Sequence, residues 1–116
     1  MHEFSIAMSI VEIAENEATK ANSNCITSMS LDVGTMAGIE YYALDTALEM
    51  AVKDTLLENA SIVVNKIQAR AKCADCNLEF DISSITDTCP DCNGLFYEVL
   101  TGKELKIRSI VVEGDD

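Results

Sequence analysis

The first half of the chain carries two stretches with helical periodicity. Between residues 5 and 21, apolar residues recur at three- and four-residue intervals, at Ile6, Ala7, Ile10, Val11, Ile13, Ala14 and Ala18. This spacing predicts an amphipathic helix with Ser5 as its N-cap and glutamates on its polar face. A second helix is predicted over residues 40–58, with one apolar side formed by Tyr41, Leu44, Ala47, Leu48, Ala51 and Val52.

Four other segments have the composition of β-strands. Residues 27–33 alternate apolar and polar side chains, residues 61–67 are rich in β-branched residues, and residues 95–100 and 105–112 form two more β-prone runs. If the last run pairs with the first two, the fold is α+β. We expect a small three-stranded sheet covered by two helices, with an inserted lobe like a zinc ribbon.

Two cysteine knuckles of identical spacing interrupt this pattern, Cys73-Ala-Asp-Cys76 and Cys89-Pro-Asp-Cys92. The two-residue gap lets both thiolates of a knuckle bind one ion, and the second knuckle completes four sulfur ligands at about 2.3 Å. Four sulfurs leave no open position, which is typical of a structural zinc site. Asn77 and Asn93, which follow the knuckles, tolerate the left-handed turn that such a site requires.

Other chemistry is open to these cysteines: two disulfides, a redox Cys-x-x-Cys motif, or an iron site in place of zinc. We favour zinc because the chain shows no secretory signal and has paired knuckles. Cys25, the fifth cysteine, lies far from the knuckles in the sequence and is given no function.

The knuckles also suggest how the chain is divided. Residues 1–68, completed by a C-terminal strand at 103–113, are expected to form an α/β domain, and residues 69–102 a zinc-binding domain. A segment as short as the latter cannot bury enough apolar surface to fold by itself, so it needs the metal as a staple.

The charge balance restricts the partners. Twenty acidic residues against eight basic ones give a formal net charge of -12. A surface that binds phosphates needs clustered Lys and Arg, so nucleic acid is an unsuitable partner. No apolar run is long enough to span a bilayer, and we expect a cytoplasmic protein that meets cations or a basic protein surface.

The amino terminus, Met1-His2-Glu3, holds the sole histidine of the chain. A free α-amine, the amide nitrogen of residue 2 and the His2 imidazole can form fused chelate rings around a metal that favours square-planar nitrogen donors, such as Ni(II) or Cu(II). Binding must release protons, so affinity should weaken as the pH falls. Taken alone, however, a terminal histidine is more often a bystander.

The order of these features resembles the HypA/HybF family of nickel metallochaperones for NiFe-hydrogenase maturation. The resemblance covers essentially the whole chain. The residues that carry it are Met1-His2-Glu3 with Ser5, the segment Val33-Gly34-Thr35-Met36-Ala37-Gly38-Ile39-Glu40, the four knuckle cysteines, and Gly102-Lys103-Glu104-Leu105 with Ser109-Ile110.

The resemblance implies a nickel site at the unprocessed amino terminus, where His2 is a ligand and Glu3 is a neighbour or a further ligand. It implies structural zinc on Cys73, Cys76, Cys89 and Cys92. It also implies two partners, a nickel-chaperone GTPase and the hydrogenase large subunit, and in some members a role in urease maturation. The chain itself is expected to be a monomer or a weak homodimer.

Two positions depart from the family pattern. Asn77 stands where glycine is common, and Tyr41 stands where proline often follows the acidic residue Glu40. Glu40 either faces the nickel site or begins the second helix, where a carboxylate is favourable.

The chain has no Gly-rich phosphate loop and no second histidine for a Ser-His-Asp set, so we expect no enzyme activity. The alternative function is a zinc-ribbon adaptor that docks another protein through its acidic surface.

Overall fold

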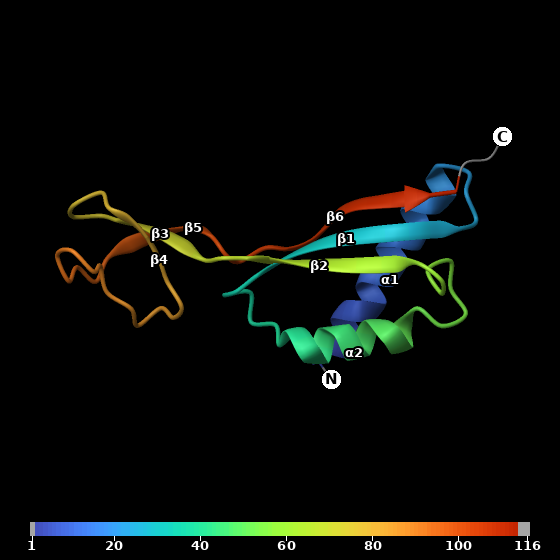
Figure 1. Cartoon of the computed structure of the whole chain (residues 1–116), viewed down its shortest axis with the longest axis horizontal. Helices are drawn as coiled ribbons and strands as arrows, with labels where there is room; N and C mark the ends of the chain where they lie inside the picture. The colour runs from blue at the N-terminus through green and yellow to red at the C-terminus, as the bar shows by residue number, and fades with distance from the viewer. Residues whose placement is uncertain (1, 114–116) are drawn as a thin grey trace. The chain divides into compact units, whose positions relative to one another are not determined.

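The computed structural model describes residues 2–113. Its elements in chain order are α1 (His2–Lys20), β1 (Ile26–Gly34), α2 (Tyr41–Ala51), β2 (Ser61–Ile67), β3 (Arg70–Cys73), β4 (Glu79–Asp81), β5 (Tyr97–Thr101) and β6 (Leu105–Val112). The strands form two three-stranded sheets, ordered β2-β1-β6 and β4-β3-β5 (Figure 1). The predicted α+β fold, with two helices and a small sheet, is confirmed.

The described residues divide into two compact units. Residues 2–31, 39–64 and 106–113 form the first unit, and residues 32–38 and 65–105 form the second. Among the described residues, no helix is both long enough and apolar enough to cross a membrane.

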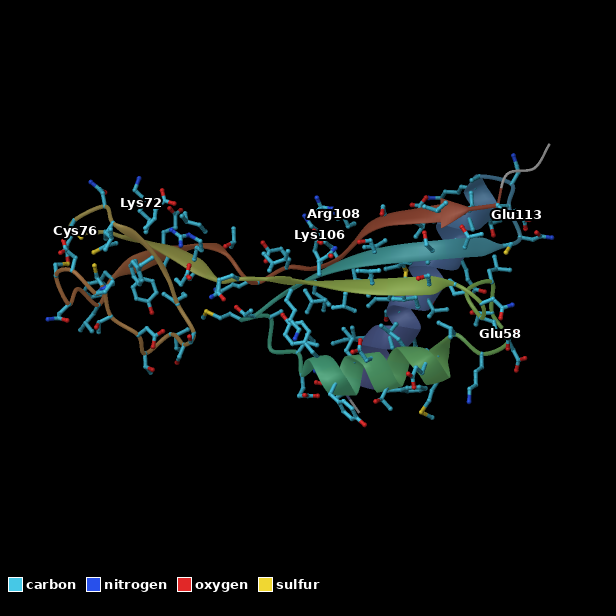
Figure 2. The ribbon with its side chains drawn as sticks, in the orientation of Figure 1. Glu58, Lys72, Cys76, Lys106, Arg108 and Glu113 are labelled. Carbon is cyan, nitrogen blue, oxygen red and sulfur yellow. The ribbon has the colours of Figure 1, made fainter. Side chains whose placement is uncertain are left out.

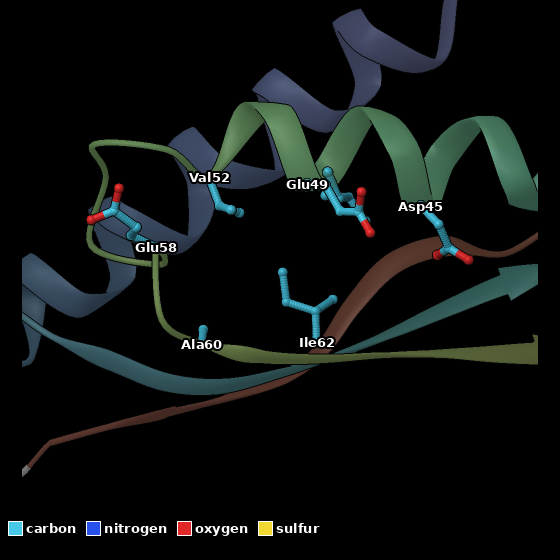
Figure 3. Close-up of a pocket in the computed structure, with 7 residues that line it drawn as sticks. Asp45, Glu49, Val52, Glu58, Ala60 and Ile62 are labelled. Carbon is cyan, nitrogen blue, oxygen red and sulfur yellow. The ribbon is translucent and has the colours of Figure 1, made fainter.

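Both helices cover one face of the β2-β1-β6 sheet (Figures 1 and 3). Strands β1 and β2 run in the same direction, and α2 connects them along the chain. Strand β6 runs in the opposite direction (Figure 1). The helical spacing predicted from the sequence is what lets α1 and α2 each bury one side. The buried residues of the two helices are Ala7, Ile10, Val11, Ala14 and Ala18 in α1, and Leu44, Ala47, Leu48 and Ala51 in α2.

Helix α1 begins earlier than the sequence pattern predicts. Its first residue is His2, so Ser5 lies inside the helix and the prediction that Ser5 is its N-cap is wrong. Glu3 lies in the first turn, where a carboxylate interacts favourably with the positive end of the helix dipole. The early start places His2 and Glu3 on a helix.

Helix α2 ends at Ala51, seven residues before the predicted end at Glu58. Asp54 adopts a left-handed conformation with φ of 62°, and the side chain of Leu57 is completely buried. The backbone N–H of Leu56 donates a hydrogen bond of 3.1 Å to the carboxylate of Glu15 in α1. These tertiary contacts turn the chain back toward the core, so the continued helical pattern of the sequence is overridden.

The second unit contains the antiparallel β4-β3-β5 sheet. Strands β3 and β4 are too short to be recognised in the sequence, and β5 begins at Tyr97 rather than at the predicted Leu95. The rings of Phe80 and Tyr97 meet edge to face at 5.6 Å. The buried core of this unit is small and consists of Ala69, Ala71, Cys73, Phe80, Ile82 and Cys89. Such a core gives little hydrophobic stabilisation.

Within the second unit, Gly34 and Gly102 meet backbone to backbone. The N–H of Met36 donates to the carbonyl oxygen of Gly102 at 2.7 Å, and the N–H of Gly34 donates to that of Glu104 at 2.8 Å. A Cβ atom on Gly34 would overlap the Gly102 carbonyl. Gly102 itself has φ of 108°, a conformation that other residues rarely adopt. Only glycine fits at this crossing.

Replacing Gly34 with alanine should therefore lower the free energy of unfolding by about 1–3 kcal/mol, as overpacking does in a tight interior. Urea unfolding of the zinc-loaded protein measures this loss. The matched control is Gly38→Asn, because Gly38 has φ of 79° with no atom near its missing Cβ, and asparagine tolerates that conformation. Equal losses in the two variants would contradict the steric explanation.

Candidate metal sites

The first cysteine knuckle begins at the last residue of β3, Cys73. The N–H of Cys73 donates to the carbonyl oxygen of Leu78 at 2.8 Å, and the N–H of Asn77 donates back to the carbonyl oxygen of Cys73 at 3.0 Å. Asn77 has φ of 64°, so the predicted left-handed turn is confirmed at this position. This hydrogen-bonded turn contains both Cys73 and Cys76.

The second knuckle repeats the same hydrogen bonds. The N–H of Cys89 donates to the carbonyl oxygen of Gly94 at 3.1 Å, and the N–H of Asn93 donates to the carbonyl oxygen of Cys89 at 2.9 Å. Asn93 has φ of 57°, which confirms the second predicted turn. The equal spacing of the two motifs in the sequence thus produces two equal local structures.

The four knuckle sulfurs converge on one point. The Sγ atoms of Cys73 and Cys92 are 3.5 Å apart, those of Cys76 and Cys89 are 3.6 Å apart, and all four lie within 4.8 Å of one another. A tetrahedron with zinc–sulfur bonds of about 2.3 Å has edges of about 3.8 Å, so the cluster fits zinc. All of these cysteines are free, and the pairs stand well beyond the roughly 2.05 Å of a disulfide.

The cluster lies at the surface of its unit. Cys73 and Cys89 are buried in the core, whereas Cys76 and Cys92 are exposed. Figure 2 labels Cys76, with further sulfur atoms in yellow beside it. An ion held here would tie the buried side of the cluster to the exposed turns of both knuckles.

The thiols of the cluster cannot all ionise without a cation, because thiolates repel one another. The N–H of Cys76, followed by that of Asp75, lowers the pKa of Cys73 to about 7. At Cys92 the N–H of Gly94 favours the thiolate, but the neighbouring sulfur of Cys73 and partial desolvation raise the pKa to about 12. A divalent ion would remove this repulsion and hold four thiolates together.

The predicted terminal donors lie in the first unit. His2 opens α1 with 68% of its side chain exposed, and its Nδ1 atom is 3.9 Å from Oε2 of Glu3. The backbone N–H groups in the first turn of a helix have no partner within the helix, so the amide nitrogen of His2 is not needed for α1. The other expected donor, the α-amine of Met1, lies outside the described residues.

The carboxylate of Glu3 accepts a hydrogen bond from the backbone. Its Oε2 atom accepts a hydrogen bond of 3.4 Å from the N–H of Glu40, just before α2. Its own N–H, then that of Glu40, and the nearby His2 lower the pKa of Glu3 below the ordinary value of 4.5. The Glu40 carboxylate is the N-cap of α2 and accepts from the N–H of Ala43. Glu40 therefore has the helix-start role that was one of its two predicted roles.

These contacts make the link between Glu3 and Glu40 dependent on pH. Because folding lowers the pKa of Glu3, its contribution to stability is present above pH 4.5 and is lost as the pH falls through the lowered value. Titration of the Glu3 carboxyl by NMR should show this pKa below the usual range. In Glu3→Gln, the protection of the Glu40 amide relative to the intrinsic exchange rate at each pH should be lower at neutral pH and should no longer change through the acid range. Unchanged protection in this variant would show that the negative charge of Glu3 adds nothing to this hydrogen bond.

The structure thus brings the four cysteines together in one unit and places His2 beside Glu3 in the other. Cys25 lies outside the cysteine cluster. Sequence reasoning missed a group of exposed apolar side chains, with Phe4 in the first turn of α1 and Tyr42 and Met50 in the first and last turns of α2. The signal was present for two of them, because Tyr42 and Met50 lie off the buried stripe of α2, whereas Phe4, three residues before Ala7, continues the stripe of α1.

Comparison with known proteins identifies close relatives of the whole chain. Residues 1–112 match the family model described as HypA, hydrogenase/urease nickel incorporation, metallochaperone. The hydrogenase maturation factor HypA of Parabacteroides distasonis is 36% identical over 113 residues, which cover 97% of this chain and 98% of the relative. The family description is that of a metallochaperone rather than of an enzyme.

The fold is also similar to solved structures. The solution structure of the Ni metallochaperone HypA from Helicobacter pylori superimposes with a TM-score of 0.68 at 18% identity, covering 97% of this chain and 98% of that one. A second solution structure, of a HypA protein, gives a TM-score of 0.71 at 19% identity and covers 99% and 98% of the two chains. At such identities the likeness shows the fold alone.

Proposed function

Since this chain belongs to the HypA family of nickel-incorporation metallochaperones, we propose that it binds one Ni(II) ion at its amino terminus and passes it on during maturation of NiFe-hydrogenase. The observation that carries this proposal is the exposed His2 imidazole on the first turn of α1. Maturation of urease is a second destination that the family description allows.

The proposed nickel donors are the His2 imidazole, the amide nitrogen of residue 2 and the α-amine of Met1. Together they form the fused chelate rings that suit a square-planar metal. The amide is not used within α1, so nickel binding does not require the helix to break. The surface position of His2 also leaves one side of the ion open to an incoming ligand.

Glu3 is the carboxylate of this site. Its Oε2 atom lies 3.9 Å from Nδ1 of His2 and is held in place by the N–H of Glu40. Nδ1 is the ring nitrogen that closes a chelate ring with the amide nitrogen of residue 2, so the Glu3 carboxylate would lie next to the bound cation. From that position Glu3 can also act as a further ligand when the ion changes its coordination.

The second metal is structural zinc, bound by Cys73, Cys76, Cys89 and Cys92. The spacing of the four sulfurs supports this assignment, and zinc supplies the cross-link that the small core of the second unit lacks. We propose that residues 69–102 act as a zinc-binding domain and that residues 1–68 with 103–113 form the nickel-binding one.

Delivery requires ligand exchange rather than catalysis. A shallow site at the chain end holds nickel strongly enough to capture it and exposes it enough for a recipient to replace the donors one at a time. The proposed partners are the nickel-chaperone GTPase of this pathway and the hydrogenase large subunit, in the cytoplasm. The GTPase performs any nucleotide hydrolysis.

Calorimetric titration with nickel tests this proposal. The zinc-loaded protein whose first residue is Met1, as checked by mass spectrometry, is compared with a version that carries a few extra residues before Met1. We expect one tight site in the first protein and loss of that site in the second, because extension turns the α-amine into an amide. Equal binding by the two proteins would contradict the proposal and favour the zinc-ribbon adaptor.

A further inference from the structure

An apolar groove lies between the start of α1 and the outer side of α2. It has a volume of about 430 Å³ and is lined by Phe4, Tyr42, Ala43, Thr46, Ala47 and Met50. The side chains of Tyr42 and Met50 are 78% and 58% exposed. Adjoining exposed apolar side chains on two elements are typical of a surface that binds another molecule.

A second hollow, of about 490 Å³, lies on the other side of α2. In Figure 3, Asp45 and Glu49 extend from α2 and Glu58 lies on the loop that follows it. These carboxylates surround the apolar side chains of Val52, Ala60 and Ile62. An apolar floor beneath carboxylates suits a side chain that has a long aliphatic stem and a cationic head. Lysine and arginine have this structure.

These carboxylates do not form a metal site. Among the described residues, the cysteine cluster is the only group of three or more possible ligands close enough together to share an ion. One oxygen of Glu58 already accepts a hydrogen bond of 3.1 Å from the N–H of Asp54. The hollow therefore suits a large organic cation better than a small inorganic one.

The groove and the hollow are neighbours on the surface of α2. Asp45 follows Tyr42 by three residues and Glu49 follows Thr46 by three, and side chains at this spacing lie side by side on a helix. A single segment lying across α2 would contact both. We propose that α2 is the docking site for an amphipathic helix of a partner protein, with apolar residues in the groove and a lysine or arginine in the hollow.

The negative charge of the protein favours a basic partner helix over a second copy of this chain as the molecule that docks on α2. The protein carries a formal net charge of -12, and two copies meeting at α2 would bring their carboxylates together. A basic helix instead gains attraction at long range and a paired cation in the hollow. The groove reaches Phe4, two residues after His2, so a partner docked there lies next to the chain end. This docking does not depend on whether His2 binds nickel.

The probe for this site is a synthetic helical peptide of about 18 residues, long enough to form helix in water. Leucine and phenylalanine occupy one stripe and arginines stand beside it. In the matched peptide every arginine is replaced by citrulline, which has the same shape and no charge. Fluorescence anisotropy gives both affinities, and amide NMR shifts of the zinc-loaded protein locate the peptide.

We expect shifts concentrated on α2 and at residues 58–62, and binding of the citrulline peptide weakened about tenfold, or 1.4 kcal/mol. Tyr42→Ser/Met50→Ser and Asp45→Asn/Glu49→Gln should each also weaken binding about tenfold. The matched control is Glu17→Gln/Glu113→Gln, which removes two exposed carboxylates that line neither hollow (Glu113 is labelled in Figure 2). It should change the affinity less than about twofold.

Three results would overturn the proposal. The first is an equal loss in the control variant, which would mean that only net charge attracts the peptide. The second is peptide shifts scattered over the acidic surface. The third is a shift from dimer to monomer in sedimentation for the Tyr42→Ser/Met50→Ser variant, which would assign the groove to a second copy. His2→Ala should bind the peptide as the native protein does, so failure of the nickel proposal and failure of this one are distinguishable.

Discussion

Replacing Cys73 with serine is expected to unfold the zinc-binding lobe of residues 69–102 and to leave the helices and the β2-β1-β6 sheet folded. Cys73 is only 1% exposed, ends β3 and belongs to both the sulfur cluster and the small core. Structural zinc contributes about 10–16 kcal/mol to the folding of small metal domains. The core that remains without it is too small to replace this stabilisation.

Two measurements together check this result. Metal analysis should show that one zinc per chain is lost, and amide NMR should show collapsed dispersion for residues 69–102 alone. Cys25→Ser is the matched control, because Cys25 is a partly buried free thiol outside the cluster. The control should keep both its zinc and its spectrum. Unfolding of the entire chain in Cys73→Ser would show instead that the two units fold as one.

Replacing His2 with alanine should weaken nickel binding more than about 100-fold, since even partners outside the ligand shell change metal affinity 10–100-fold. The imidazole is the single side-chain nitrogen proposed to bind the ion, and the chain has no second histidine to replace it. Calorimetry with nickel measures the change, and zinc content and the circular dichroism spectrum should stay as in the native protein.

The native site should also weaken as the pH falls, because the protonated α-amine and imidazole and the amide nitrogen of residue 2 must each lose a proton to bind the metal. In His2→Ala the imidazole no longer contributes, so the residual affinity should depend less steeply on pH. Ser5→Ala is the control, since Ser5 is an exposed residue of the same helix. Retention of native affinity by His2→Ala would exclude His2 as a ligand.

The elements that could be predicted from the sequence are those whose signal is local. The helical spacing of α1 and the alternation of β1 identify most of the buried face of each element, because a single amphipathic segment carries that information by itself. Ile13 and Thr27 are exposed and Asp32 is buried, against the pattern. The left-handed turns at Asn77 and Asn93 are local in the same way. Each depends on a few consecutive residues and on the hydrogen bonds between them.

The features that were not predicted depend on contacts between distant residues. The end of α2 is set by the burial of Leu57 and by the hydrogen bond from Leu56 to Glu15, which is 41 residues away in the sequence. The link between Glu3 and Glu40 spans 37 residues. A periodic pattern contains no information about such a partner.

By itself, the sequence determined the fold class, the resemblance to the family and the set of possible metal ligands, because periodicity and the spacing of cysteines are properties of short segments. Only the tertiary structure decided that the four sulfurs converge within 4.8 Å, that Glu3 is held by the start of α2, and that α2 lies between an apolar groove and an acidic hollow. These contacts form because tertiary packing brings together segments that are far apart in the sequence.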